Sequence, residues 1–143
     1  MAKFSYEREV HYYETDQMGI VHHSNYIRWM EEARIAILAE IGLPYDKMEE
    51  EGILIPVLTA SCQYRLAFRF GDSFVVRICP QEFNGVKLKI SYKIYHKETN
   101  ALHATGETSH CFTDKEMKLL RLKKDYPDLY EGLFAWSKEQ CND

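Results

Sequence analysis

The feature that most constrains the fold is a helical segment, from Ser24 to about Ile41, that is apolar over most of its surface. At about 100° per residue, five apolar side chains fall within an arc of roughly 80°: Tyr26, Met30, Ala33, Ile37 and Ile41. The flanks of that arc are apolar as well, through Ile27, Trp29, Ile35 and Leu38. Ser24 is the expected N-cap, and Gly42 followed by Pro44 ends the helix. Such a helix has to be covered on more than one side by the rest of the chain.

Most of the remaining chain has the period of β-strands. A first strand is expected over residues 4–13, followed by a loop over residues 14–23 that contains Gly19 and matches no period. After the helix, residues alternate between apolar and polar, and Asn84-Gly85 is a strong hairpin signal. The further strands are expected at Val57–Phe70, Phe74–Cys79, Val86–His96 and Leu102–Phe112. A short terminal helix, Tyr126–Gln140, begins with Pro127 at its first turn.

This order of elements predicts an α+β fold in which one antiparallel five-stranded sheet wraps around one long central helix. No repeat or linker divides the chain, so residues 1–143 are expected to form a single domain. Small residues at Ala104, Gly106 and Thr108 would let the helix pack close to the sheet, although Gly106 could equally mark a bulge. Long unpaired sheet edges are normally protected by pairing with another copy, which points to a homodimer or homotetramer.

The composition is that of an ordinary globular domain, with 45% apolar and 28% charged residues and a net charge of −4. This charge argues against a dedicated nucleic-acid or membrane-surface protein. The first ten residues hold four charges, and no stretch approaches the ~20 apolar residues of a membrane span. The four cysteines form no C-x-x-C pair and are expected to be isolated thiols in a reducing compartment, the cytoplasm.

Candidate chemical groups concentrate where the first strand leads through the glycine loop into the long helix. Unsatisfied amides at a helix start carry a partial positive charge, and each donor that stabilises an oxyanion is typically worth ~10²–10³ in rate. Asp16 lies seven residues before His23, at the start of the helix, and could attack a carbonyl held there or activate water. This arrangement is suited to acyl transfer to water.

Simpler roles are available for each of these residues. Asp16 could order its loop through an Asx-turn, and Glu14 could be solvated or a local hydrogen-bond partner. His22 and His23 could be surface residues. His11, Asp16, His22 and His23 match no metal-ligand spacing, so no metal or other cofactor is expected.

Taken together, fifteen positions of this region resemble the signature of one family, the hotdog acyl-CoA thioesterases related to 4-hydroxybenzoyl-CoA thioesterase. The matching residues are Tyr13, Glu14, Thr15, Asp16, Gly19, Val21, His23, Asn25, Tyr26, Arg28, Trp29, Glu31, Glu32, Ala33 and Arg34. The similarity extends over roughly residues 5–115, including the Gly71-Asp72 turn.

The resemblance implies a hotdog fold and a role for each matching site residue. Asp16 would be the nucleophile or general base, and the backbone N–H of His23 would polarise the thioester carbonyl, with the imidazole orienting the thioester or Asp16. Gly19, Val21 and Tyr26 would contact the substrate. Relatives commonly have Tyr or Trp where His22 stands, so the acyl pocket is expected to differ there.

The function expected from these residues is hydrolysis of an acyl-CoA thioester to free acid and CoA, with the acyl group left open. One alternative is a hotdog hydratase or dehydratase that would use His23 with Glu31 or Glu32. Both glutamates are, however, expected to form ordinary surface ion pairs with Arg28 and Arg34. The other alternative is a non-catalytic subunit that binds acyl thioesters.

Overall fold

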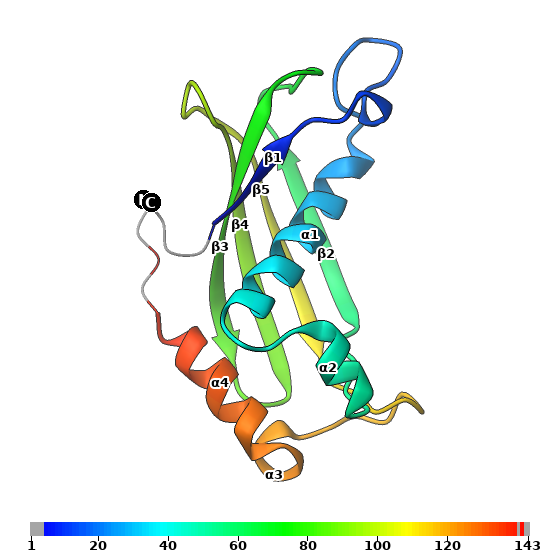
Figure 1. The fold of residues 1–143 in the computed structure, drawn as a ribbon, viewed down its shortest axis with the longest axis vertical. Coiled ribbons are helices and arrows are strands. Elements are labelled where there is room, and N and C mark those ends of the chain that lie inside the picture. The colour runs from blue at the N-terminus through cyan, green and yellow to red at the C-terminus, as the bar shows by residue number, and fades with distance from the viewer. Residues whose placement is uncertain (1–4, 140, 142–143) are drawn as a thin grey trace.

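The fold consists of a five-stranded antiparallel sheet that curves around a central helix, α1 (Figure 1). It is seen in a computed structural model that describes residues 5–139 and 141. The order of strands in the sheet is β1-β3-β4-β5-β2. The strands are β1 (Ser5–Glu9), β2 (Val57–Tyr64), β3 (Ser73–Phe83), β4 (Lys87–His96) and β5 (Leu102–Cys111). The helices are η1 (Tyr12–Glu14), α1 (Ser24–Glu40), α2 (Tyr45–Glu50), α3 (Leu122–Asp125) and α4 (Pro127–Ser137). The predicted α+β hotdog architecture is confirmed.

Helix α1 occupies the hollow of the sheet because its apolar side chains are buried against the strands. Its buried apolar residues are Tyr26, Trp29, Met30, Ala33, Ile37 and Leu38. Helix and sheet approach closely at Gly106, where an added Cβ would collide with the Met30 sulfur. The pairing of β5 with β2 and β4 runs through Gly106 without a register shift, so this glycine serves close packing and not a bulge.

Several element boundaries differ from the sequence-based expectation. Strand β1 ends at Glu9, and Tyr12 and Tyr13 belong to a 3-10 turn instead of the strand. The N-cap of α1 is His23, one residue before the expected Ser24. Strand β2 stops at Tyr64 because the N–H groups of Arg65 and Leu66 both donate to the His103 carbonyl, which turns the chain out of the ladder. The predicted terminal helix is confirmed over Pro127–Ser137 and ends before Lys138 and Glu139, and Gln140 lies outside the described residues.

The prediction of four isolated thiols is wrong for two of the cysteines. Cys79 on β3 and Cys141 form a disulfide whose Cα atoms are 5.8 Å apart, whereas Cys62 and Cys111 are free. The pair is separated by 62 residues, and it meets because α4 packs against β3. Sequence spacing carries no sign of such a contact.

Arg34 is buried, with only 4% of its surface exposed, and so the prediction of a surface ion pair at this residue is wrong. Its guanidinium donates to the hydroxyls of Tyr45 (3.0 Å) and Tyr92 (3.2 Å). The Tyr92 hydroxyl contacts Thr108 Oγ1 at 2.6 Å, and Thr108 Oγ1 contacts Nε2 of His110 at 2.9 Å. A chain of polar contacts therefore crosses the interface between α1, β4 and β5.

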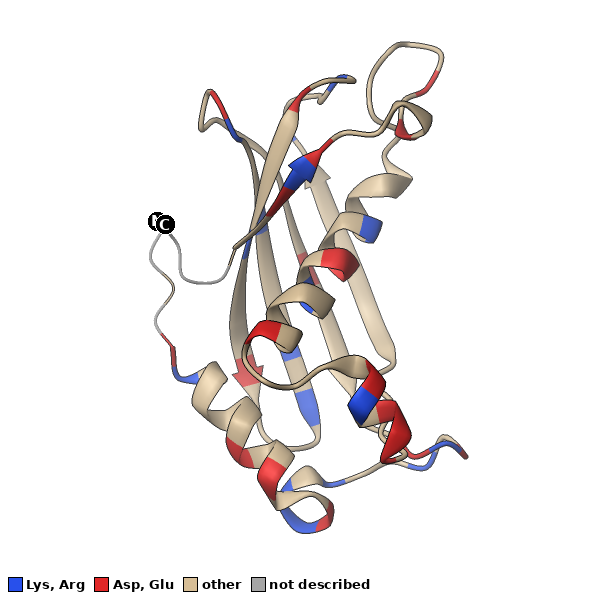
Figure 2. Cartoon of the chain, in the orientation of Figure 1, with Lys and Arg blue, Asp and Glu red and all other residues tan. Residues whose placement is uncertain are grey.

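Charged residues of both signs are spread over the helices and the other strands, whereas β2 carries none (Figure 2). Within the described part of the chain, no helix has the length and apolar character needed to cross a membrane.

Candidate active site

The glycine loop between η1 and α1 folds back on itself, so its two ends lie together at the start of α1 (Figure 1). Thr15 forms an antiparallel bridge with Val21, and the N–H of His22 donates to the Glu14 carbonyl at 2.8 Å. Gly19 makes the tight turn with a φ of +79°, a conformation that L side chains rarely adopt. Asp16 is thereby carried back toward the first residues of α1.

Asp16 is half-buried and its two carboxylate oxygens have different surroundings. Oδ1 accepts a hydrogen bond from the N–H of Met18 at 2.8 Å, which is the Asx-turn considered from the sequence. Among the described residues, no hydrogen bond reaches Oδ2. Because one oxygen is fixed by the loop and the other is free, the turn and a catalytic role are compatible.

His23 presents an unused backbone donor at the start of α1. The N–H groups on either side are satisfied, since that of His22 donates to Glu14 and that of Ser24 donates to Nδ1 of His22 at 3.2 Å. Within residues 5–139, no acceptor is found for the His23 N–H. A free amide in this position, where the helix dipole is positive, can stabilise negative charge on a carbonyl oxygen.

The imidazoles of His22 and His23 are both exposed. The two rings stack with their centroids 4.3 Å apart, and the His23 ring also meets the Tyr64 ring edge-on. Nδ1 of His22 contacts Ser24 Oγ at 2.9 Å. His22 therefore lies beside the expected reaction site, where a different residue could change the wall of a pocket.

The residues expected to contact substrate divide into an exposed glycine and two core residues. Gly19 is exposed at the tip of the loop. Val21 and Tyr26 are buried, and the Tyr26 ring packs against Trp29, Tyr64 and Phe68. Burial raises the pKa of the Tyr26 hydroxyl to about 12, so it stays protonated at neutral pH. Contact between these residues and a substrate stays a prediction.

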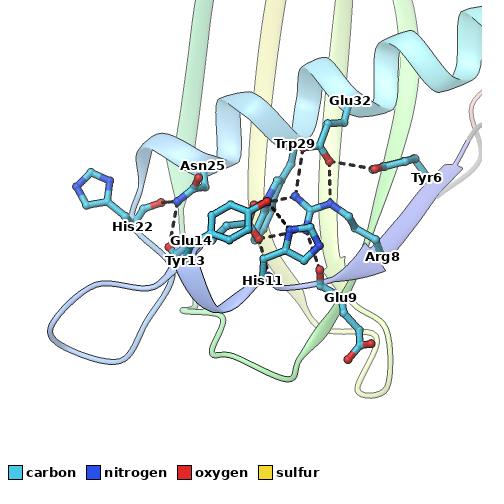
Figure 3. A network of polar contacts seen from close by, with 10 residues as sticks. All are labelled: Tyr6, Arg8, Glu9, His11, Tyr13, Glu14, His22, Asn25, Trp29 and Glu32. Carbon is cyan, nitrogen blue, oxygen red and sulfur yellow. Dashed lines mark hydrogen bonds and ion pairs between the residues drawn. The ribbon is translucent and has the colours of Figure 1, made fainter.

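A partly buried ionic network lies between β1, η1 and α1, beside the loop (Figure 3). Glu14 is only 1% exposed, so the solvated role considered for it from the sequence is wrong, and the role of hydrogen-bond partner is confirmed. The Arg8 guanidinium binds the carboxylates of Glu14 and Glu32, and Trp29 Nε1 donates to Glu14 at 2.9 Å. Tyr6 completes the network by donating to Glu32 at 3.0 Å.

This network determines the charge state of Glu14. Burial alone would raise the pKa of the Glu14 carboxyl, but hydrogen bonds from Arg8, Trp29 and the His11 backbone together lower it to about 2. The two carboxylates outweigh the effect of burial on Arg8 and raise its pKa above the usual value. Glu14 is therefore an anion at neutral pH, and a proton-transfer role for it is disfavoured.

Apolar side chains surround the loop on the protein surface. Tyr12 and Tyr13 are each 75% exposed and Met18 is 72% exposed, while Phe70 packs edge-on against Tyr12 with the centroids 5.5 Å apart. Tyr64 and Leu66 are also exposed, at and beyond the end of β2. So many large apolar groups around one loop favour a surface that a ligand or another chain covers.

The role of Arg8 was not predicted from the sequence, although a signal for it existed. Tyr6 and Arg8 occupy alternating positions of β1, and Val10 continues this alternation just after the strand, which places Arg8 on the same side as the buried Val10. A basic residue on a core-facing strand position indicates a buried acidic partner. Among the described residues, no group of three or more His, Cys, Asp or Glu side chains could hold a metal ion.

Comparison with known proteins shows the family. A model described as the Thioesterase-like superfamily matches residues 10–132. A putative acyl-CoA thioesterase, YneP, of Bacillus subtilis is 39% identical over 123 residues, which are 85% of this chain and 88% of that protein. The crystal structure of DHNA-CoA thioesterase from Staphylococcus aureus aligns with a TM-score of 0.87 and 29% identity, covering 92% of this chain and 88% of the other.

The structure of a hypothetical protein from Aquifex aeolicus aligns with a TM-score of 0.83 and 35% identity, covering 91% of this chain and 98% of the other. The narrower assignment, to relatives of 4-hydroxybenzoyl-CoA thioesterase, stays a prediction. Because the family model matches residues 10–132 and the chain has the fold of these enzymes, the chain belongs to the Thioesterase-like superfamily of hotdog proteins.

Proposed function

We propose that the protein hydrolyses acyl-CoA thioesters to the free acid and CoA. The observation that carries this proposal is the pairing, on one closed loop, of the Asp16 carboxylate with the unused N–H of His23. Membership of the superfamily and the names of the relatives support the same activity.

In the proposed reaction, the thioester carbonyl oxygen accepts a hydrogen bond from the His23 N–H and gains negative charge as the carbonyl carbon is attacked. Asp16 acts through its free Oδ2. It either attacks the carbonyl carbon itself, which gives a mixed anhydride that water then cleaves, or removes a proton from the attacking water. In both routes the carbon–sulfur bond breaks and the CoA thiolate leaves and takes up a proton.

A hydratase that used Glu32 is disfavoured by the surroundings of this residue. That reaction needs a carboxylate on α1 that is free to exchange a proton close to a histidine. Glu32 is bound by Arg8 at 2.8 Å and by Tyr6 at 3.0 Å, on the side of α1 that faces β1. A carboxylate held by these two contacts has a structural role.

The acyl-CoA site is proposed to be completed by a second copy of the chain. Strand β2 forms one edge of the sheet and carries no charged residue, and Val57, Leu58 and Tyr64 expose their side chains on it. Tyr64 also connects this edge to the site, because its hydroxyl donates to the His23 carbonyl at 3.2 Å. A homodimer that pairs the two β2 edges would cover the apolar surface beside the loop.

The test is thiol release from a panel of acyl-CoAs with short-chain, long-chain and aromatic acyl groups. We expect stoichiometric release of CoA and free acid from at least one class. A 3-hydroxyacyl-CoA should yield thiol and no new double bond, whereas formation of an enoyl product would favour the hydratase. Saturable binding without thiol release from any member would favour a non-catalytic subunit and contradict the proposal.

A further inference from the structure

Glu14 stands out because every acceptor position of its carboxylate is used inside the protein. Oε1 accepts from the N–H of His11 at 2.8 Å and from Arg8 Nη1 at 3.1 Å. Oε2 accepts from Arg8 Nη2 at 2.7 Å and from Trp29 Nε1 at 2.9 Å. These four donors come from β1, from the turn before η1 and from α1, so Glu14 joins three segments at one point (Figure 3).

The cation that binds Glu14 is equally constrained. Arg8 uses Nε and Nη2 to bind Glu32, both Nη atoms to bind Glu14, and Nη1 to donate to the Glu9 carbonyl at 2.7 Å. All five N–H donors of the guanidinium are therefore satisfied. The guanidinium also lies 5.1 Å from the centroid of the Phe74 ring. Because of these contacts, the position of Glu14 is fixed relative to the sheet.

The backbone of Glu14 connects this fixed point to both halves of the proposed site. Its carbonyl accepts from the N–H of His22 at 2.8 Å and from Asn25 Nδ2 at 3.0 Å. His22 immediately precedes His23, whose N–H is the proposed oxyanion donor. In the other direction along the chain, Asp16 follows Glu14 by two residues.

We infer that Glu14 is a positioning residue for thioester hydrolysis, which sets the separation between the Asp16 carboxylate and the His23 amide. This inference rests on the proposed function. A displacement of about 1 Å between reacting groups can cost ~10²-fold in rate, so a residue that fixes the separation acts on kcat without touching the substrate.

Glu14→Gln tests the inference because it keeps the size of the side chain and removes one acceptor oxygen. The new NH₂ group would face N–H donors of Arg8, Trp29 or His11, and the carboxamide would have to move. We expect kcat for thiol release to fall about 10-fold or more, with KM within about twofold of wild type. Arg8→Lys keeps the positive charge but loses the paired N–H donors of the guanidinium, and we expect a smaller fall in kcat, again with little change in KM.

Glu32→Gln is the matched control. It removes a carboxylate from the same guanidinium, but Glu32 has no contact with the loop of Asp16 among the described residues. We expect a lower melting temperature and a kcat within about twofold of wild type. The indole N–H resonance of Trp29 should move in Glu14→Gln and stay in place in Glu32→Gln, which reports the network without any assay of activity.

The same series includes Asp16→Asn and the double variant Asp16→Asn/Glu14→Gln. If Glu14 acts through Asp16, the double variant should be no slower than Asp16→Asn alone. Normal kcat in folded Glu14→Gln, or an equal fall of kcat in Glu32→Gln, would overturn the inference while leaving the thioesterase proposal intact. Normal kcat in Asp16→Asn would instead overturn the catalytic assignment of Asp16. A wild-type protein that releases no thiol would overturn the proposed function. The inference about Glu14 would be overturned by either result.

Discussion

Asp16 has two tasks that a single substitution can separate. Oδ1 closes the Asx-turn with Met18, and the chemistry is assigned to Oδ2. Asp16→Asn retains an oxygen for the turn and removes both nucleophilicity and basicity, so kcat for acyl-CoA hydrolysis should fall by at least ~10²-fold. Substrate binding and melting temperature should change much less. Thiol release measured beside a melting curve checks this, and near-normal kcat would show that Asp16 only orders its loop.

His23 should be less sensitive than Asp16, because its proposed catalytic group is a backbone N–H. The imidazole stacks on His22 and contacts the Tyr64 ring, and both contacts are on the surface. His23→Ala keeps the amide, so we expect a partial loss of kcat that is smaller than the loss in Asp16→Asn. Folded His23→Ala protein as inactive as Asp16→Asn would instead make the imidazole the principal acid or base.

At the scale of elements, the long periodic segments were predictable and the ends of elements were not. The apolar period from Tyr26 to Ile37 and the turn chemistry of Asn84-Gly85 are local signals, and both led to the correct elements. Strand β2 was predicted too long because its alternation continues past Tyr64, where contacts with His103 take the chain out of the sheet. Such contacts have no local signature.

The candidate site shows the same division. The loop and the start of α1 were located correctly from the sequence, and the unused amide of His23 is in the expected place. The burial of Glu14 and Arg34 was missed because their partners lie on other elements, Arg8 on β1 and Tyr92 on β4. A charged residue is exposed by default; the alternation of β1 indicates a buried partner for Arg8, whereas no comparable signal marks the contact between Arg34 and Tyr92.

The interface between α1 and the sheet predicts how stability depends on pH. Burial of His110 on β5, reinforced by the positive charge of Arg34, lowers the pKa of the imidazole from 6.5 to about 4. Between these values the unfolded chain binds more protons than the folded chain, so stability is complete above pH 6.5 and falls as the pH decreases toward 4. Protonation of His110 should lower the free energy of unfolding by roughly 3 kcal/mol as the pH approaches 4.

Urea unfolding at several pH values between 7 and 4 measures this effect. His110→Gln should flatten the dependence of stability on pH in that interval. A smaller slope should remain from His103, because burial also lowers the pKa of its imidazole. Identical slopes for wild type and His110→Gln would contradict a buried neutral imidazole.

Glu14 affects stability at lower pH. The pKa of its carboxyl is about 2, below the ordinary 4.5, so its contribution to stability is present above pH 4.5 and is lost toward pH 2.

For the whole molecule, the two edges of the sheet have opposite characters. Strand β1 carries Glu7, Arg8 and Glu9, and charges of this kind discourage pairing with another strand. Strand β2 carries no charge, and no described strand pairs with its outer edge. Its exposed apolar residues continue into the surface around the Asp16 loop. The proposed second copy would account for both the open edge and the apolar surface beside the loop.

This explanation predicts that the active unit is at least a dimer of the 16.9 kDa chain and that the β2 edge holds it together. Leu58 is 51% exposed on β2, and Leu58→Glu would bring two like charges together across a β2–β2 pair. We expect wild type to sediment at micromolar concentration without a dominant monomer, and Leu58→Glu to shift to monomer with a parallel loss of thiol release per chain. Phe134→Glu, on the exposed side of α4, is the control and should keep both assembly and activity. A fully active wild-type monomer would contradict this prediction, because one chain would then form the complete site. The apolar surface around the Asp16 loop would in that case be covered by substrate and not by a second copy.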